Sequence, residues 1–283
     1  MITFGQAFGG GGGASAGGWS TTITASRSIT FTEAGTVVLS VVGAGGGGAV
    51  NAGGANCASG GNSAPWGRKK FPVVNGDVLA FTMGAGGAKA GTTAANGSQG
   101  GTTTITLNGV TILTVQGGEG GVYVATTTGP AQPVVPAATV TGADYWVPGI
   151  RAGAASTTTG ARTGGAAVDV LGNGTGKSPN VTTNVAGVGG SVGTDAGGVF
   201  LAWLALTDWG IAITDPAQAS STTGAPGRGG SSSVPVKAGA FAGEAADNTG
   251  SGGYGAGGGA SSGTGSASNG GPAYAHLTFT PEA

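Results

Sequence analysis

Apolar and polar residues alternate in several short segments near the start of the chain and again at its end. Residues 22–24 and 28–32 alternate with a period of two, which is typical of a strand with one buried face. Residues 37–42 are more continuously apolar and predict a more deeply buried strand. Residues 273–280 alternate again, with His276 on the polar face. No segment combines helical periodicity with caps, so we expect an all-β fold with little α-helix.

Two turn signals lie between predicted strands. Residues 71–74 and 78–83 flank Asn75-Gly76-Asp77, which predicts two strands about a tight turn. Residues 102–107 and 110–116 flank Asn108-Gly109. The Asn-Gly pair suits a type I′ turn, because both central residues of that turn need a positive φ. This second pair is the clearest hairpin in the sequence.

Three predicted strands run directly into glycine tracts, which begin at Gly43, Gly84 and Gly117. Glycine accounts for 66 of the 283 residues, but it holds no sustained period of three, so a collagen helix is not expected. A flexible linker is one interpretation of residues 220–271. The other is a bundle of extended, polyglycine II-like helices whose amides bond to neighbouring helices, and the need of every amide for a partner favours it.

The strands cluster in residues 20–117 and reappear only in the last ten residues. A lone terminal strand is not stable by itself, so we expect it to return to the early sheet and complete a β-sandwich. The glycine tracts should then leave one edge of that sandwich together, from the ends of neighbouring strands at Val42, Met83 and Gln116. The predicted divisions are a glycine-rich leader or docking arm (1–18), a sandwich core (19–121), a glycine-rich excursion (122–271) with an apolar island (199–213), and a returning strand (272–283).

The composition argues against several classes of function. Charged residues make up only 7% of the chain and the net charge is −1, so nothing favours binding to nucleic acid or to an anionic membrane. One cysteine and one histidine cannot build a disulfide framework or a zinc site, and we expect no metal or cofactor. The N-terminus lacks the features of a secretory signal peptide. The longest apolar run, residues 199–206, is too short to cross a bilayer.

The sequence predicts no catalytic residue. Residues 171–178 approach a phosphate-binding loop, but Pro179 follows at once and no helical pattern begins there. His276 has no neighbouring nucleophile or base motif, so an ordinary strand histidine is the simpler interpretation. Asp208 and Asp215 flank a predicted strand and are a conceivable glycosidase pair that nothing else in the sequence marks.

Four aromatic residues are candidates for receptor or partner contact, because tryptophan and tyrosine dominate binding hot spots. Trp203 and Trp209 lie in the apolar island, where burial in a core or a subunit interface is the alternative interpretation. Tyr145 and Trp146 lie in a segment bounded by glycine and proline, where exposure on a loop and burial are both open.

These patterns resemble the glycine-rich domains of bacteriophage tail proteins. Residues 28–42, ending in the glycine tract 43–48, are similar to the opening of that domain. Residues 73–87 match its next segment, and residues 270–279 resemble its final strand. The resemblance covers about residues 27–121 and 269–281, while the middle of the chain matches in composition alone. About twenty residues precede the first predicted strand, which fits a tip, cap or peripheral subunit better than a fibre shaft.

The resemblance implies a structural virion protein of the phage tail, as a minor tail, tip or fibre subunit, that takes part in host attachment by binding and not by catalysis. The implied partners are other tail proteins, a host-envelope glycan or protein receptor, and further copies of the chain, usually as a trimer. The protein would be made in the host cytoplasm without a signal peptide and located in the virion. Two alternatives remain: a glycine-rich bacterial cell-surface scaffold, and a tail-associated hydrolase of envelope glycans.

Overall fold

The computed structural model describes the chain at residues 17–51, 57–91, 94–124, 139–149, 255, 257–258, 261–262, 267 and 269–282. Among these residues every regular element is a β-strand. The predicted all-β fold class is therefore confirmed, and no helix is present in the described part of the chain.

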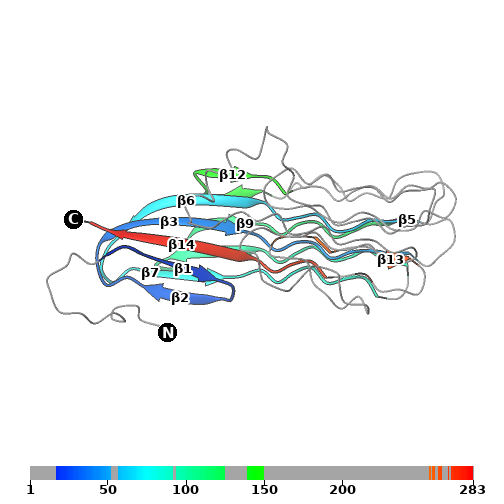
Figure 1. The fold of residues 1–283 in the computed structure, drawn as a ribbon, viewed down its shortest axis with the longest axis horizontal. Coiled ribbons are helices and arrows are strands. Elements are labelled where there is room, and N and C mark those ends of the chain that lie inside the picture. The colour runs from blue at the N-terminus through cyan, green and yellow to red at the C-terminus, as the bar shows by residue number, and fades with distance from the viewer. Residues whose placement is uncertain are drawn as a thin grey trace.

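Two five-stranded antiparallel sheets form the broad end of the molecule (Figure 1). The first sheet has the order β1 (Trp19–Ile23), β14 (Tyr274–Pro281), β3 (Gly35–Val42), β6 (Trp66–Val73) and β12 (Tyr145–Val147). The second has the order β11 (Val140–Thr141), β9 (Val110–Val115), β8 (Thr103–Leu107), β7 (Val78–Thr82) and β2 (Arg27–Thr30). The C-terminal strand β14 thus lies between two early strands, as the sequence predicts.

Two short ladders lie far from the sheets, at the opposite end of the molecule (Figure 1). The first pairs β10 (Tyr123–Val124) with β5 (Cys57–Ala58) in antiparallel fashion. The second pairs β13 (Ser261–Ser262) with β4 (Val50–Asn51) in parallel fashion.

One hydrophobic core contains side chains from both sheets, because each strand alternates its side chains between two faces. On β14, for example, Leu277 and Phe279 enter the core, whereas Thr278 and Thr280 face the other way. Trp19 and Phe31 pack against Phe279, with ring centroids 5.4 and 5.5 Å from the ring of Phe279. These three rings gather apolar area at the end of the core where β14 finishes.

The hairpin between β8 and β9 has the predicted turn. Asn108 has φ 51° and Gly109 has φ 80°, the signature of a type I′ turn, and Leu107 pairs with Val110. The Asn108 side chain also donates to the Asp77 carboxylate (2.7 Å), and this bond lowers the pKa of Asp77. The turn is therefore tied to the neighbouring turn at residues 74–77.

The neighbouring turn also lies between two strands, as predicted, but it does not form a hairpin. Strands β6 and β7 do not pair with each other: β6 belongs to the first sheet and β7 to the second. The reason lies in the end of β2, because the Gly76 N–H donates to the Phe31 carbonyl (2.8 Å) and the Phe31 N–H donates to the Asp77 carbonyl (2.9 Å). Gly76, at φ 92°, therefore takes the chain across from one sheet to the other.

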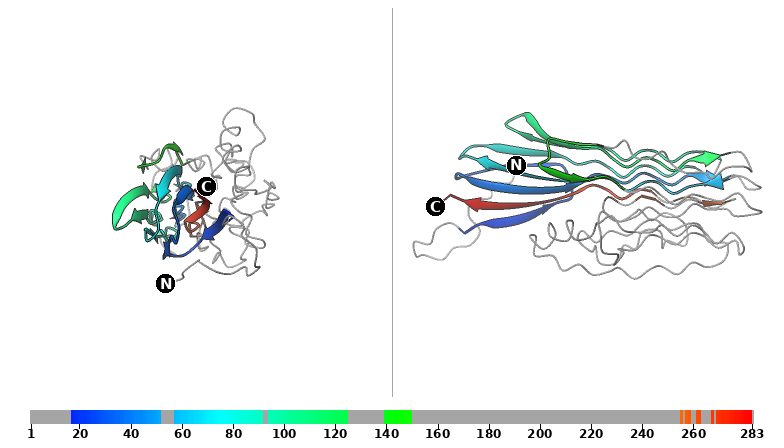
Figure 2. Two further views of the ribbon diagram at one scale, coloured as in Figure 1. Left: turned by 90° about the vertical axis from the view of Figure 1, so that its left-hand side faces the viewer. Right: turned by 90° about the horizontal axis from the view of Figure 1, so that it is seen from above.

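The glycine tracts leave the sandwich at one end, but not from neighbouring strands. Val42 ends β3 in the first sheet, whereas Met83 and Gln116 follow β7 and β9 in the second sheet, with β8 between them. The tracts therefore emerge from both layers and run side by side away from the sandwich (Figures 1 and 2).

Residues beyond the predicted core boundary at 121 also join the sheets. Strand β11 pairs with β9 and strand β12 pairs with β6, so residues 139–149 supply one edge strand to each sheet. Gly67 makes this approach possible, since a Cβ there would lie 2.6 Å from Val140 Cγ1. The rest of the predicted excursion lies mostly outside the described residues.

His276 gives the fold a pH dependence. The side chain is 6% exposed and lies in register with Thr22 and Ser40, and burial lowers its pKa below the ordinary 6.5. As the pH falls through about 6.5, His276 takes up a proton in the unfolded chain while it stays neutral in the folded chain. Lower pH therefore favours the unfolded state. We expect the free energy of unfolding, measured with urea, to fall between pH 7.5 and 5.5 by up to about 1.4 kcal/mol per pH unit.

His276→Gln is the matched control for this loss. It removes the titrating group, so its unfolding free energy should change much less over the same interval. Asp77, whose pKa is lowered from 3.8, contributes only at more acidic pH. An equal loss in the wild type and in His276→Gln would contradict the assignment.

Candidate functional site

Beyond the sandwich, extended segments pack as a bundle around one central segment, residues 43–50. We call this arrangement the glycine bundle. Its outer segments are residues 58–65, 84–90, 95–101 and 117–122 together with the described parts of 255–262 and 267–273. The segments are joined mainly by backbone hydrogen bonds, with some side-chain bonds such as that from the Lys89 N–H to Asn269 Oδ1 (2.8 Å). Figure 2 shows several of the segments running in parallel rows.

Every third amide of the central segment points to the same neighbour. Three of them donate to segment 58–65: Gly43 to Pro65 (3.1 Å), Gly46 to Asn62 (3.0 Å) and Ala49 to Ser59 (3.1 Å). A period of three is the repeat of the polyproline II helix, which makes no internal hydrogen bonds. The central segment is therefore a polyglycine II-like helix, and each of its three directions of donation is available to a different neighbour.

Whether an outer segment runs parallel or antiparallel to the central segment determines whether it bonds to the central carbonyls or to the central amides. The central amides donate to antiparallel segments: Gly45 bonds Gly271 (2.9 Å), Gly47 bonds Ser98 (2.9 Å) and Val50 bonds Ala95 (3.1 Å). The central carbonyls accept from parallel segments: Gly45 from Gly87 (2.8 Å), Ala44 from Gly118 (2.8 Å) and Gly46 from Gly258 (2.7 Å). Only Val50, at the far end, also accepts from an antiparallel residue, Ala95 (3.2 Å).

The outer segments also bond to one another and close a ring around the centre. The bonds that join successive neighbours are Asn62 to Glu119 (2.8 Å), Gly100 to Gly118 (2.9 Å), Ser98 to Ala88 (2.9 Å), Gly270 to Gly87 (2.9 Å), Gly255 to Pro272 (3.0 Å) and Gly61 to Gly258 (2.9 Å). Segments that run away from the sandwich alternate around this ring with segments that return. Each described segment therefore has bonded partners on several sides, which explains how chain almost free of side chains can be ordered.

Glycine is required where two backbones touch. A Cβ at Gly46 would collide with the Glu119 carbonyl, one at Gly61 with the Gly46 carbonyl, and one at Gly270 with the Gly45 carbonyl. Side chains are confined to the remaining positions. In residues 84–91, the residues at 84, 87 and 90 are buried, whereas Ala85, Ala88 and Gly91 are exposed, with the same period of three.

The bundle brings several chain reversals to one end. The central segment and residues 84–90 and 117–122 run away from the sandwich, and residues 58–65 and 95–101 return to it. The chain must therefore turn back at the far end each time. The candidate site is the described far end of the bundle, where the short ladders β5–β10 and β4–β13 lie, because binding residues concentrate where a scaffold ends in turns of the chain.

Tyr145 and Trp146, the predicted contact residues, lie elsewhere. They are on β12, the edge strand of the first sheet, and are 38% and 41% exposed. Because side chains alternate along a strand, the two rings lie on opposite faces of the sheet and do not form one platform. Tyr145 packs edge-on against Trp66, with centroids 5.7 Å apart. Both rings therefore flank a sheet edge instead of standing on a loop.

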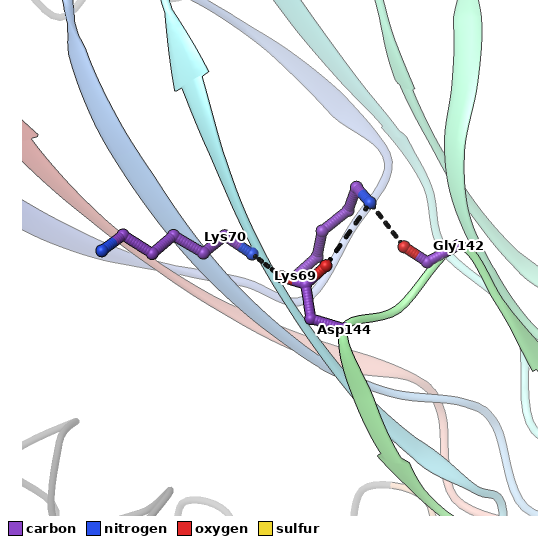
Figure 3. A network of polar contacts seen from close by, with 4 residues as sticks. All are labelled: Lys69, Lys70, Gly142 and Asp144. Atoms are coloured by element: carbon purple, nitrogen blue, oxygen red, sulfur yellow. Dashed lines mark hydrogen bonds and ion pairs between the residues drawn. The ribbon is translucent and has the colours of Figure 1, made fainter.

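Lys69 and Lys70 on β6 hold this edge strand in place (Figure 3). The backbone N–H of Lys70 donates to Asp144 Oδ2 (2.6 Å), and Lys69 Nζ donates to the Gly142 carbonyl (2.6 Å). Lys69 Nζ also lies 3.9 Å from Asp144 Oδ1, an exposed pair that contributes at most about 1 kcal/mol. Lys69 therefore helps to hold β12 through its side chain, whereas Lys70 does so through its backbone.

The other candidates of the sequence analysis are not placed by the structure. The residues outside the described part of the chain are Trp203, Trp209, Asp208, Asp215 and residues 171–178, which approach a phosphate-binding loop in sequence. In the described part, no three histidine, cysteine or acidic side chains gather as metal ligands. No helix there has the length and hydropathy that a membrane crossing needs.

One part of the bundle was missed by sequence reasoning. The composition of residues 49–67, which are rich in glycine, asparagine, alanine and serine, is typical of a loop, yet residues 58–65 are a buried outer segment. Ser59 Oγ accepts from the Val122 N–H (2.9 Å), so a loop-like residue serves as a packing residue. Only the neighbouring glycine tracts could have signalled this, since no hydrophobic period marks the segment.

The sequence matches no known protein-family model, and no curated protein is significantly similar to it.

Gly61→Ala tests the requirement for close backbone contact. The new methyl group would collide with the carbonyl of Gly46 in the central segment, and the backbone can relieve the collision only by breaking bonds of the bundle. We expect a loss of about 1–3 kcal/mol in the free energy of unfolding, measured with urea.

Gly91→Ala is the matched control. A Cβ at Gly91 meets no atom within 4 Å, so its effect should stay within about 0.5 kcal/mol. Equal effects of the two substitutions would show that the bundle in solution is looser than its bonding pattern indicates.

Proposed function

We propose that this protein is a structural subunit of a bacteriophage tail, at the tip or on a fibre, and that it attaches to the host surface by binding and not by catalysis. The observation that carries the proposal is the glycine bundle, which holds several chain reversals at one end of a cross-bonded rod. The strand and glycine segments that resemble phage tail domains are those that build the sandwich and this bundle.

The bundle suits a protein that works outside the cell. Its backbone groups bond to neighbouring segments in several directions, so local opening must break bonds to more than one partner. Its surface is almost uncharged, since only 7% of the chain is charged, and its bonds depend little on ionic strength. Such a rod can carry binding loops away from the tail without a large hydrophobic core.

The two ends then take different roles. Gly18 lies against the end of β14 and the Glu282 N–H donates to the Ala34 carbonyl (3.1 Å), so both described ends of the chain lie at the sandwich. We assign tail attachment to the sandwich and host contact to the far end of the bundle. The proposed partners are other tail proteins, a glycan or protein of the host envelope, and further copies of the chain as a trimer.

Two measurements test this function. Mass spectrometry of purified virions should detect the protein, and the isolated protein should adsorb to host cells and compete with phage adsorption. Detection only in the envelopes of uninfected cells would instead support a cell-surface scaffold. Release of soluble fragments from host wall glycans would instead support an envelope hydrolase.

Tyr145 and Trp146 are proposed contacts to a neighbouring copy or tail protein, because they are large exposed side chains on an edge strand of the sandwich. We expect the double substitution to alanine to weaken self-association, or association with the tail, by about 2 kcal/mol, which is about 30-fold. Sedimentation of the purified protein and its copy number in virions measure this effect. Adsorption of the isolated protein to host cells should stay unchanged.

Val110→Ala is the control, since Val110 is 67% exposed in the hairpin turn at the opposite end from the bundle. Its self-association should equal that of the wild type. Loss of host adsorption in the Tyr145/Trp146 variant, with self-association intact, would move the receptor contact from the far end to β12.

A further inference from the structure

The outer faces of the two sheets are buried to very different extents. On the first sheet, Tyr274, Val42 and Trp66 lie in register across three strands, on the face opposite the core. They are only 1%, 1% and 4% exposed. In the next row, Ser40 and His276 are 0% and 6% exposed. A row of large side chains on the outer face of a sheet is shielded from water only when another layer covers it.

The second sheet shows what an uncovered face looks like. Its outward positions include Ala80, Thr104, Thr106 and Thr114, which are all partly exposed, and Thr82, which is exposed. These residues are small, and all but Ala80 are polar, as expected for a face in contact with water. The burial on the first sheet is therefore a property of that side of the molecule.

The outer segments of the bundle also differ in how far they are buried. Segment 58–65, which continues into β6, is buried at every described position, whereas residues 84–91 are exposed at every third position. Segment 58–65 bonds to the central segment, to 117–122 and to Gly255 and Gly258. An outer segment with neighbours on only one side should expose its other side.

The backbone N–H of Gly60 indicates that further chain lies on the other side of segment 58–65. The amides of Ser59 and Asn62 donate to segment 117–122, and those of Gly61 and Ala64 donate to Gly258 and Gly255. The repeat of three therefore directs the Gly60 N–H toward a further direction, away from both of these neighbours. Gly60 is buried, so a hydrogen-bond acceptor is required on that side.

We propose that this side of the molecule is a docking surface for the chain's own residues 150–254. The surface consists of the outer face of the first sheet at Tyr274, Val42 and Trp66 and of the adjoining side of segment 58–65. The occupant is more than a third of the chain.

Both ends of the occupant support this assignment. The chain departs after Gly149, which is packed so closely on Ser63 that a Cβ would collide with the Ser63 carbonyl. It returns at Gly255, which accepts from the Ala64 N–H (2.8 Å) and donates to the Pro272 carbonyl (3.0 Å). Ala64 and Pro272 are each two residues from an aromatic of the buried row, so the segment leaves and re-enters beside the surface.

The composition of the segment matches the surface. Residues 150–254 are rich in glycine, alanine, serine and threonine, whose backbones can approach the glycine bundle closely, and they include the apolar residues 199–213 opposite an apolar row. A receptor, a tail protein or a second copy is then excluded from this side. The surfaces that remain for such a partner are the second sheet, the β12 edge and the far end of the bundle.

Site-specific photo-crosslinking of the full chain tests the proposal. Benzoylphenylalanine replaces Thr278, the half-buried neighbour of the covered row on β14, and in a control variant it replaces Thr106 on the second sheet. A mixture of unlabelled and ¹⁵N-labelled chains distinguishes crosslinks within one chain from crosslinks between copies. Urea denaturation first shows that both variants keep the stability of the parent.

We expect irradiation at position 278 to give crosslinked peptides from residues 150–254 of the same chain, at a yield at least about tenfold above that from position 106. Crosslinks between labelled and unlabelled chains would show that a second copy is the occupant and would overturn the proposal. A yield at position 278 no higher than at position 106 would also overturn it. None of these outcomes depends on the phage function, which host adsorption and virion composition test separately.

Discussion

The structure depends on hydrogen bonds between backbones that have almost no side chains between them. A β-sheet uses its amides in two directions within one plane, whereas the segment 43–50 sends amides and carbonyls to neighbours all around it. Antiparallel neighbours accept from its N–H groups and parallel neighbours donate to its carbonyls. Because each glycine is costly to order, by about 1–2 kcal/mol of backbone entropy, these bonds must form together or not at all.

The sandwich makes such joint formation possible by setting the register of the bundle. Strands β3, β7 and β9 each continue directly into a segment that runs outward, and β6, β8 and β14 each receive a segment that returns. The hydrophobic core fixes these strands laterally through side chains such as Leu39, Leu113 and Leu277. The glycine segments therefore start from fixed positions, and side-chain burial in one half of the molecule stabilises side-chain-free packing in the other.

The sequence predicts the half of the structure that side chains encode. Alternation indicates the strands, and Asn108-Gly109 indicates its turn, because both signals are local. The turn at 74–77 is recognisable too, but its residues do not indicate which strands pair. Hydrogen bonds between this turn and Phe31 place β7 in the second sheet, beside β2. The partners of segment 58–65 leave no pattern at all, since its bonds join backbones far apart in the chain. Tyr145 and Trp146 are recognisable as candidates, but the three-residue strand β12 is too short for its period to be seen.

The same geometry restricts where recognition can evolve. Along the described bundle, a side chain at Gly46, Gly61 or Gly270 would collide with a neighbouring backbone, whereas other positions carry side chains, both outward ones such as Ala85 and buried ones such as Asn62. The restriction therefore falls on the positions where two segments touch, and the exposed positions such as Ala85, Ala88 and Gly91 remain open to substitution. Substitution in the rod is therefore limited by backbone contact and not by burial alone, because the tightest approaches between segments leave no room for a Cβ atom.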